Sequence, residues 1–485
     1  MGLLSILVPL GLLVVGAYRG WSILLLAPLC ALLAALMSGE PVLASWTQVF
    51  MRTAADFIAQ FFPLFLLGAL FGKLMEASGS VEVIANRMIA ALGTRRGILA
   101  IVLAGALVTY GGVSLFVAFF VLAPMSHAVF KAANVPVRLM PAAIALGTST
   151  FTMSAMPGTP AIQNAIPMPF FGTTPYAAPG LGIVASAIML AFGLWWLERA
   201  ASRAQAAGHG YAVPEDVAPP VDVTEDEVLR ERAAFSREFD PNEMRRGDRA
   251  PAPPPLILAG LPLAMVVLTN LAMSFAILPR IDAAFLKEPR WGETSLPAVS
   301  GVWSVIVALA VGIVVLLAAN RTRLPHLRET MGAGVHASVL PILSVASLVG
   351  FGAVVAMLPA FEAVKAWVLG IEGGPLVSLA IATNILAALT GSASGGLTIA
   401  LDALGPTYMS IANQIGLDPA LMHRVAVIGA GTLDSLPHNG AVVTLLAVCG
   451  TTHKDAYLDI VMAAIVGALL ALAAVIVLGS MVGSF

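Results

Sequence analysis

The residues with the clearest chemical potential in this sequence are Asp434 and His438, which stand four positions apart in the segment TLDSLPHNGA. An ionisable side chain at membrane depth is costly, so it usually serves a function and has a partner. Histidine titrates near neutral pH, and an aspartate removed from water can do so as well. The pair therefore predicts a proton-coupling site. The alternative is a structural pair that holds an unwound segment in place, and Asp402 is a further candidate.

The segment around this pair has a counterpart 280 residues earlier in the chain, where TMSAMPGTPA matches it and TYGGVSLF matches TGSASGGL. Helix-breaking and polar residues that interrupt apolar runs at corresponding places in two halves indicate the binding site of a transporter. Such interruptions persist in lipid only where protein or a watery cavity satisfies the freed backbone groups. The matched positions are Gly111 and Gly391, Ser114 and Ser394, and Pro157 and Pro437.

The two glycine- and serine-containing segments could bind an anion. Each would start a helix, and the first amides of a helix favour a negative ligand. Glycine lets the backbone approach closely, and the hydroxyl groups add donors. The alternative is that glycine and serine merely permit close helix packing. The substrate-binding residues predicted in these segments are Gly111, Gly112, Ser114, Thr390, Ser392, Ser394 and Gly395.

The two proline-containing segments could supply a second layer of the site. Proline removes a helical hydrogen bond and frees carbonyl groups that can bind a cation or a substrate hydroxyl. A simple packing kink does not explain why so many polar residues gather there. The polar residues are Thr148, Ser149, Thr150, Thr152, Ser154, Thr159, Gln163 and Asn164 around the first proline, and Thr432, Asp434, Ser435, His438 and Asn439 around the second.

Many membrane-spanning helices must surround these segments. Of the 485 residues, 59% are hydrophobic and 11% are charged, whereas roughly 25% are charged in an average soluble domain. The two cysteines, Cys30 and Cys449, lie in or beside apolar runs and offer no disulfide framework or metal cluster. The sequence also lacks the motifs of ATPases, hydrolases and zinc proteases. We therefore predict an all-α polytopic membrane protein that is not an enzyme and has no catalytic residues, metal, cofactor or nucleic-acid partner.

A polar, proline-rich segment divides the chain into residues 1–198, a linker at 199–253 and residues 254–485. We predict that each flanking part is one repeat with five spans, a re-entrant hairpin and a broken helix. A hairpin is favoured because arms of about 14 and about 16 residues rise ~21 and ~24 Å, less than the ~30 Å hydrocarbon core. The hairpins are expected at about 97–130 and 375–412, and the broken helices at about 139–165 and 421–447.

The placement of basic residues predicts the orientation of the two repeats. With two hairpins, nineteen of the 25 basic residues fall on one side, against fifteen with straight helices. Because cytoplasmic loops carry the excess of Lys and Arg, hairpins are favoured and the linker is predicted to be cytoplasmic. The second repeat is then inverted relative to the first, in a bacterial inner membrane. Arg138 and Arg424 lie at predicted helix starts, as interfacial anchors or as residues that draw anions in.

The segments LTIALDALGPTYM and HRVAVIGAGTLDSLPHNGAVVTLLAVCGTTHKDAYLDI resemble the gluconate permease family and its hydroxybutyrate-permease-like relatives, within the ion transporter superfamily. The resemblance implies a proton- or sodium-coupled carrier of carboxylates, commonly a dimer that works by an elevator motion, with paired hairpins whose tips bind substrate. Residue by residue, it implies a site formed by Ser392, Ser394, Asp434, Ser435, His438 and Asn439, with Ser114, Ser154 and Thr159 as partners from the first repeat.

We therefore expect proton-coupled symport of a small organic (hydroxy)carboxylate such as gluconate or 3-hydroxybutyrate, and a small keto acid or a citrate-like acid is equally compatible. The expected partners are this anion, protons or Na⁺, the lipid bilayer and a second copy of the chain. A proton is favoured over sodium because a titratable pair is present at membrane depth. Two alternatives remain open: a sodium-coupled carrier or ion antiporter of the same superfamily, and a membrane sensor or scaffold that signals through the 199–253 linker.

Overall fold

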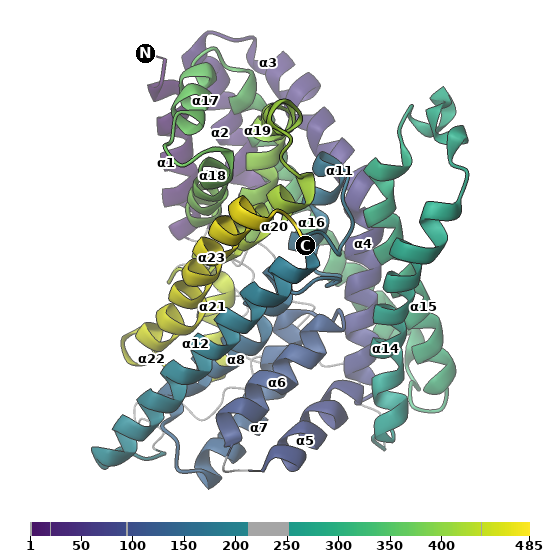
Figure 1. Ribbon diagram of the computed structural model, residues 1–485, viewed down its shortest axis with the longest axis vertical. Coiled ribbons are helices and arrows are strands. Elements are labelled where there is room, and N and C mark those ends of the chain that lie inside the picture. Colours follow the sequence, from purple (N-terminus) through teal and green to yellow (C-terminus); the bar gives the residue numbers. More distant parts are fainter. Residues whose placement is uncertain (1, 20, 94–95, 212–251, 438) are drawn as a thin grey trace.

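The computed structural model describes residues 2–19, 21–93, 96–211, 252–437 and 439–485, and within these ranges it is helical and contains no strand (Figure 1). The predicted all-α class is confirmed. Most of the predicted linker lies outside the described residues, as does His438.

The helices of the first half run from the N-terminus to the linker. They are α1 (Leu4–Tyr18), α2 (Ile23–Ser38), α3 (Val42–Ala44), α4 (Met51–Ala77), α5 (Ser80–Leu92), α6 (Gly97–Tyr110), α7 (Leu115–Ala132), α8 (Met140–Thr148), α9 (Phe151–Ser154), α10 (Ile162–Ala165), α11 (Pro167–Phe171) and α12 (Pro179–Ala206). A π-helical turn, Ser45–Phe50, joins α3 to α4, so that this element runs unbroken over 36 residues.

The second half repeats this order of elements. Its helices are α14 (Leu256–Ala272), α15 (Leu296–Ala319), α16 (Leu327–Met357), α17 (Phe361–Leu369), α18 (Pro375–Thr390), α19 (Ala393–Ile415), α20 (Pro419–Thr432), α21 (Gly440–Val448), α22 (His453–Ile460) and α23 (Gly467–Val482). In both halves two helices and a long third helix precede a helical hairpin, an interrupted helix and a closing long helix.

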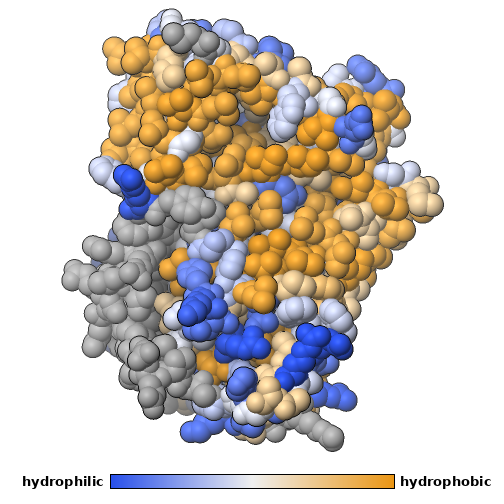
Figure 2. Space-filling model, turned by 90° about the vertical axis from the view of Figure 1, so that its left-hand side faces the viewer, coloured by the Kyte–Doolittle hydropathy of each residue, from blue (hydrophilic) through white to orange (hydrophobic). Residues whose placement is uncertain are grey.

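Seven described helical segments are long and apolar enough to cross a membrane. They are Val42–Ala77, Leu115–Ala132, Pro179–Ala206, Leu256–Arg280, Leu296–Ala319, Leu327–Met357 and His453–Val482, and the shorter apolar helices are Leu4–Gly16, Ile23–Ser38, Gly97–Tyr110 and Pro375–Thr390. Figure 2 shows a broad hydrophobic surface over the upper and middle parts of one face, with more hydrophilic residues towards the lower end. Large apolar side chains such as Leu25, Ile183 and Val314 are exposed. This is the surface of a multi-pass membrane protein, in which lipid covers the apolar side chains.

The two halves pack through their longest helices, α4 and α16, which lie along each other. Helix α15 of the second half packs on α4, and α2 of the first half packs on α16, so each half contributes helices to the other's surroundings. Figure 1 shows α14 and α15 on one flank beside α4, with α1, α2 and α17 to α19 at the opposite upper flank. Pro63 and Pro341 lie inside this central helix pair.

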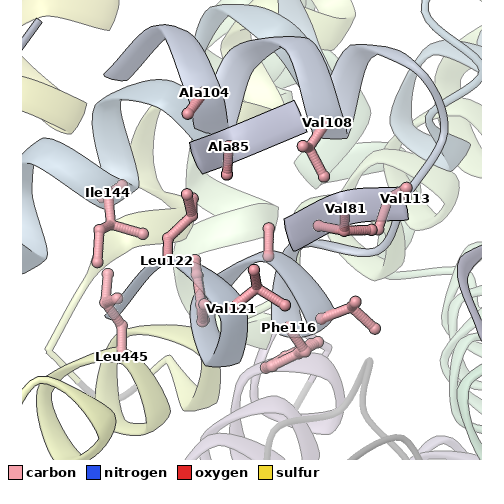
Figure 3. Close-up of a cluster of buried hydrophobic side chains, with 14 of the residues drawn as sticks. Val81, Ala85, Ala104, Val108, Val113, Phe116, Val121, Leu122, Ile144 and Leu445 are labelled. Atoms are coloured by element: carbon pink, nitrogen blue, oxygen red, sulfur yellow. The ribbon is translucent and has the colours of Figure 1, made fainter. Parts of the chain in front are cut away.

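The chain is interrupted at both places where the sequence predicts hairpin tips. Helices α6 and α7 are separated by residues 111–114, and α18 and α19 by residues 391–392, and the two helices of each pair contact each other. Figure 3 shows the buried apolar cluster around the first pair, which includes Val108 from α6, Leu122 from α7, Val81 from α5 and Ile144 from α8. Tight packing of this kind fixes the tip in space, because a packed core deforms little.

Candidate functional site

A cavity of about 140 Å³ lies where the first hairpin tip, the first interrupted helix and the central helix pair meet. Its wall is mostly apolar and includes Leu64, Leu309 and Pro341. The polar side chains on the wall come from both halves of the chain: Thr109, Ser114, Gln163, Ser338 and Ser394. Among the described residues that line it there is no Asp, Glu, Lys or Arg. A ligand here would meet hydroxyl, amide and backbone groups rather than a charged side chain.

The first hairpin tip presents its backbone to this cavity. Gly112 has a φ of +98°, which disfavours a side chain, and a Cβ there would lie 3.2 Å from Pro160 Cγ. Ser114 then begins α7, and its Oγ accepts a hydrogen bond from the amide of Phe116 at 3.3 Å. Gly112, Ser114 and Phe116 all line the cavity. The start of an 18-residue helix therefore faces the cavity, where helical amides favour an anion.

The second hairpin tip is braced from within. Ser392 Oγ accepts a hydrogen bond from the amide of Gly395 at 3.1 Å, and Thr390 Oγ1 donates to the carbonyl of Ser392 at 3.1 Å. A Cβ at Gly396 would lie 2.3 Å from the backbone nitrogen of Ala387, so this glycine serves close helix packing. Ser394 is the residue of this tip that lines the cavity.

The freed carbonyls of the first interrupted helix are satisfied by side chains from several elements. Tyr110 donates to the carbonyl of Pro157 at 2.8 Å, and Asn270 of α14 donates to the carbonyl of Gly158 at 2.9 Å. Asn164 Nδ2 donates to the carbonyls of Thr159 at 3.1 Å and of residue 175 at 3.0 Å. The segment is therefore held in a defined shape by protein groups, as irregular backbone in a membrane requires.

Gln163 is the polar residue of the cavity wall that most clearly needs a ligand. Its side chain is only 6% exposed, yet its Oε1 has no hydrogen-bond partner among the described residues. A buried acceptor without a partner is costly, so a donor on a bound molecule would be favoured there. The sequence includes Gln163 in the first polar cluster without giving it a binding role, and only its place on the wall distinguishes it from its neighbours.

The second interrupted helix lies behind the second tip. Asn439 Nδ2 donates to Asp434 Oδ1 at 2.8 Å and to the carbonyl of Gly391 at 3.1 Å, while its Oδ1 accepts from the amide of Ala441 at 2.7 Å. From α22, Tyr457 donates to the carbonyl of Ser435 at 3.2 Å. The side-chain amide of Asn439 thus links Asp434 to the hairpin tip, so a change in the charge of Asp434 can alter the hydrogen bonding of the tip.

Asp402, the further candidate, is largely buried in α19, and its Oδ2 has no hydrogen-bond partner among the described residues.

Of the predicted binding residues, three line the cavity: Gly112, Ser114 and Ser394. The other predicted residues lie outside the wall of the cavity. Gly111 faces Leu263 of α14, and Ser154 Oγ donates to the carbonyl of Thr150 at 3.0 Å within its own short helix. The predicted binding and coupling residues outside the described wall of the cavity are Gly111, Ser154, Thr159, Thr390, Ser392, Gly395, Asp434, Ser435 and Asn439.

Two neighbouring residues of α20, His423 and Arg424, are fully buried against the first half. The guanidinium of Arg424 donates to the carbonyl of Ala177 at 2.7 and 3.1 Å, to that of Ser154 at 3.4 Å and to Asn164 Oδ1 at 3.4 Å. His423 Nε2 donates to the same Asn164 oxygen at 3.2 Å. Of the two positions left open by the sequence, an interfacial anchor and an entry residue, Arg424 occupies neither. Arg138 is part-exposed and pairs with Asp459 at 2.5 Å.

Comparisons with known proteins place the chain among transporters. It is 40% identical over 467 residues to the uncharacterized transporter YxjC of Bacillus subtilis (strain 168), covering 95% of each chain. The solved structure of Neisseria gonorrhoeae MtrF, described with a class of antimetabolite efflux pumps, aligns with a TM-score of 0.52 at 13% identity, covering 88% of this chain and 83% of that one. At this identity the second likeness concerns the fold alone.

Residues 2–172 match the model of the GntP family of permeases. This match and the 40% identity to a transporter of similar length confirm the family resemblance predicted from the sequence. They also indicate a transporter and not an enzyme. The chain belongs to the GntP permease family.

Proposed function

We propose that this permease is a secondary carrier that moves a small hydroxycarboxylate together with protons across the bacterial inner membrane. The observation that carries the proposal is a cavity bordered by Gly112 and Ser114 of one hairpin tip and by Ser394 of the other. Its volume of about 140 Å³ is well below the roughly 300–1,000 Å³ of pockets for drug-sized ligands. A substrate with few heavy atoms fits such a space.

The chemistry of the wall supports an anion that carries a hydroxyl group. Residues Ser114 to Phe116 at the start of α7 line the cavity. Amides at a helix start favour a carboxylate without requiring a buried counter-charge. The Oε1 atom of Gln163, which lacks a donor among the described residues, would accept the hydrogen of a substrate hydroxyl. A hydroxy acid satisfies both groups at once. A simple keto acid would leave the Gln163 oxygen without a donor.

Proton coupling is assigned to Asp434 with His438, and Asp402 is a second acidic candidate. Asp434 is linked through Asn439 to the backbone of the second tip at Gly391. Protonation of Asp434 would remove the negative charge to which the Asn439 amide donates, and would thereby change the position of the tip. Coupling to Na⁺ instead of protons is the competing proposal within the same carrier, since freed carbonyls and carboxylates also suit that ion.

Opposite orientation of the two halves would give the carrier its alternating access, with residues 199–253 in the cytoplasm. The repeated order of elements and the reciprocal packing of α2 on α16 and of α15 on α4 support this arrangement. In such carriers one body rocks or slides against the other around a fixed site. A homodimer is the proposed assembly.

The decisive experiment is uptake into proteoliposomes that contain the purified protein. Labelled 3-hydroxybutyrate and gluconate are offered with an inward proton gradient, an inward Na⁺ gradient or neither, and acetoacetate serves as the matched acid without a hydroxyl group. The proposal expects accumulation of a hydroxy acid with the proton gradient and weak competition by acetoacetate. Accumulation that follows Na⁺ alone would replace the coupling ion. Ion exchange without movement of either acid would favour the antiporter alternative and end the proposal.

Removal of residues 212–248 distinguishes a carrier from a sensor that signals through the linker. A carrier keeps most of its flux in this variant, whereas a sensor loses its output.

A further inference from the structure

The cavity wall carries no charged side chain among the described residues, yet a buried cation lies directly behind it. Arg424 is 0% exposed and donates to the carbonyl of Ser154 and to the side chain of Asn164. The chain neighbours of these two residues, Met153 and Gln163, form part of the wall. Only one layer of residues therefore separates the guanidinium from the cavity.

The positive charge of Arg424 is not cancelled locally. All four of its hydrogen bonds end on neutral oxygens, and within the described residues no carboxylate lies within ion-pair distance. The adjacent His423 donates from Nε2 to Asn164 and lies 2.6 Å from the hydroxyl of Thr173, which can donate to its Nδ1. Both bonds suit the neutral ring. Arg424 thus supplies a net charge in a water-poor setting, where screening is weak.

The other buried cation near the first tip does not offer the same field. Lys73 of α4 is buried and pairs with Glu76 at 3.0 Å, so the two charges largely offset each other. Its neighbour Gly72 lies close to the backbone nitrogen of Ser114. Of these two cations, Arg424 is therefore the one whose charge reaches the cavity without a carboxylate beside it.

We infer that Arg424 sets the preference of the cavity for anions, acting through its field across the Asn164 and Ser154 layer rather than by touching the substrate. The inference rests on the proposed function, because it assigns the source of the selectivity for a carboxylate. At an effective dielectric of about 20, a unit charge on the order of 10 Å from an anion changes the affinity for that anion on the order of tenfold. The α7 amides orient the carboxylate, and Arg424 makes the electrostatic potential of the site positive.

The test compares an acid with its uncharged analogue. Binding of 3-hydroxybutyrate and of 3-hydroxybutyramide to the purified full-length protein is measured by calorimetry, and the ratio of the two affinities is the readout. Loss of a purely structural contact lowers both affinities together, whereas loss of the field lowers the affinity for the acid alone.

Two substitutions remove the field in different ways, and two retain it. Arg424→Gln deletes the charge, and Asn164→Asp places a carboxylate against the guanidinium while keeping oxygen acceptors for it. Each is expected to lower the acid-to-amide ratio about tenfold. Arg424→Lys keeps the charge, and Arg52→Gln changes an exposed arginine of α4. Both should keep the ratio within about twofold of wild type.

The outcomes distinguish this inference from the proposed function. If the wild-type protein prefers the acid and Arg424→Gln and Asn164→Asp keep that preference, the inference is wrong although the proposed function stands. The same holds if Arg424→Lys lowers the ratio as much as Arg424→Gln. If the Gln variant does not fold, the Asp variant decides. If the wild type binds neither compound and no hydroxy acid is taken up, the proposed function fails, and this inference falls with it.

Discussion

Residues 111–114 and 391–394 stand 280 positions apart in the two halves of the chain. Helix α7 nevertheless begins at Leu115 and α19 at Ala393, which is two residues earlier once this offset is applied. The reason lies in the second residue of each tip. Gly112 adopts a φ of +98°, while its counterpart Ser392 has a φ of −152° and the left-handed residue is Gly391 instead. A serine is disfavoured in the conformation of Gly112, so the second turn closes sooner.

This difference separates two tasks. The longer first tip exposes backbone to the cavity from Gly112 to Phe116, whereas the second tip contributes Ser394 and is braced behind by Asn439. Under the proposed function, the first half would bind the substrate, and the second half, which contains Asp434, would couple its movement to an ion. The two tips have the same spacing in sequence but differ in their proposed roles.

Replacement of Asp434 by asparagine should have the largest effect, because it removes the charge on which the proposed coupling depends. Accumulation driven by a proton gradient is expected to fall about 100-fold, equivalent to roughly 2.7 kcal/mol. Exchange of labelled for unlabelled substrate at equal pH should change less than about threefold, since the first tip is untouched. The two assays are run in proteoliposomes beside Asp282→Asn, an exposed carboxylate. Accumulation that stays normal would show that the second repeat does not couple.

The next substitution copies the second tip into the first. Gly112→Ser introduces a side chain at a left-handed residue and close to Pro160, so the tip should shift or lose its shape. We expect substrate affinity to fall roughly 30-fold, as about 2 kcal/mol of strain would require. Gly68→Ser is the control, because a Cβ on that cavity-lining glycine would meet open space. Equal loss in both variants would argue that volume rather than backbone conformation matters.

Removal of one hydroxyl from each tip sharpens the comparison further. Ser114 caps α7 at the cavity, whereas Ser394 lies inside the first turn of α19. Loss of a cap and a donor to a charged group costs about 1.5 kcal/mol, so Ser114→Ala should lower affinity roughly tenfold. For Ser394→Ala about threefold is expected. Titration of each variant with labelled hydroxy acid gives the order, and the reverse order would assign the main binding role to the second repeat.

The smallest effects expected are on stability rather than transport, and the comparison uses Thr159 and Asn439, which stand 280 residues apart in the two interrupted helices. Thr159 accepts one hydrogen bond from the amide of Ala161 at 3.3 Å, while Asn439, its counterpart, makes three. Thr159→Ala should lower the free energy of unfolding by about 0.5–1 kcal/mol and Asn439→Ala by about 2–3 kcal/mol. Thermal unfolding in detergent measures the difference. If both variants unfold at the same temperature, the second tip is not braced as described.

The sequence predicted where the chain breaks, because glycine, proline and serine interrupt apolar runs and those interruptions repeat at a fixed offset. It also predicted the family from motifs in the last hundred residues, while the family model matches residues 2–172. Gly112 and Ser114 were predicted from local sequence chemistry, and both line the cavity.

Other features depend on contacts between distant segments and were not found. The missing partner of Gln163 becomes evident only once neighbouring helices are in place, since eight polar residues surround the same proline in sequence. Arg424 stands at a predicted helix start, and its burial depends on carbonyl groups some 250–270 residues earlier. The two-residue difference between the tips likewise follows from backbone conformation.

The hydrogen bond from Asn270 of α14 to the carbonyl of Gly158 joins the outer helices to the interrupted helix of the first repeat. If that helix travels with the substrate while α14 stays fixed in the bilayer, this bond must open in every turnover and be replaced by water or by another donor. The hydrogen bond of Asn270 then adds to the energy barrier of the movement and slows the transport cycle. A variant without this hydrogen bond would transport faster but would be less tightly gated.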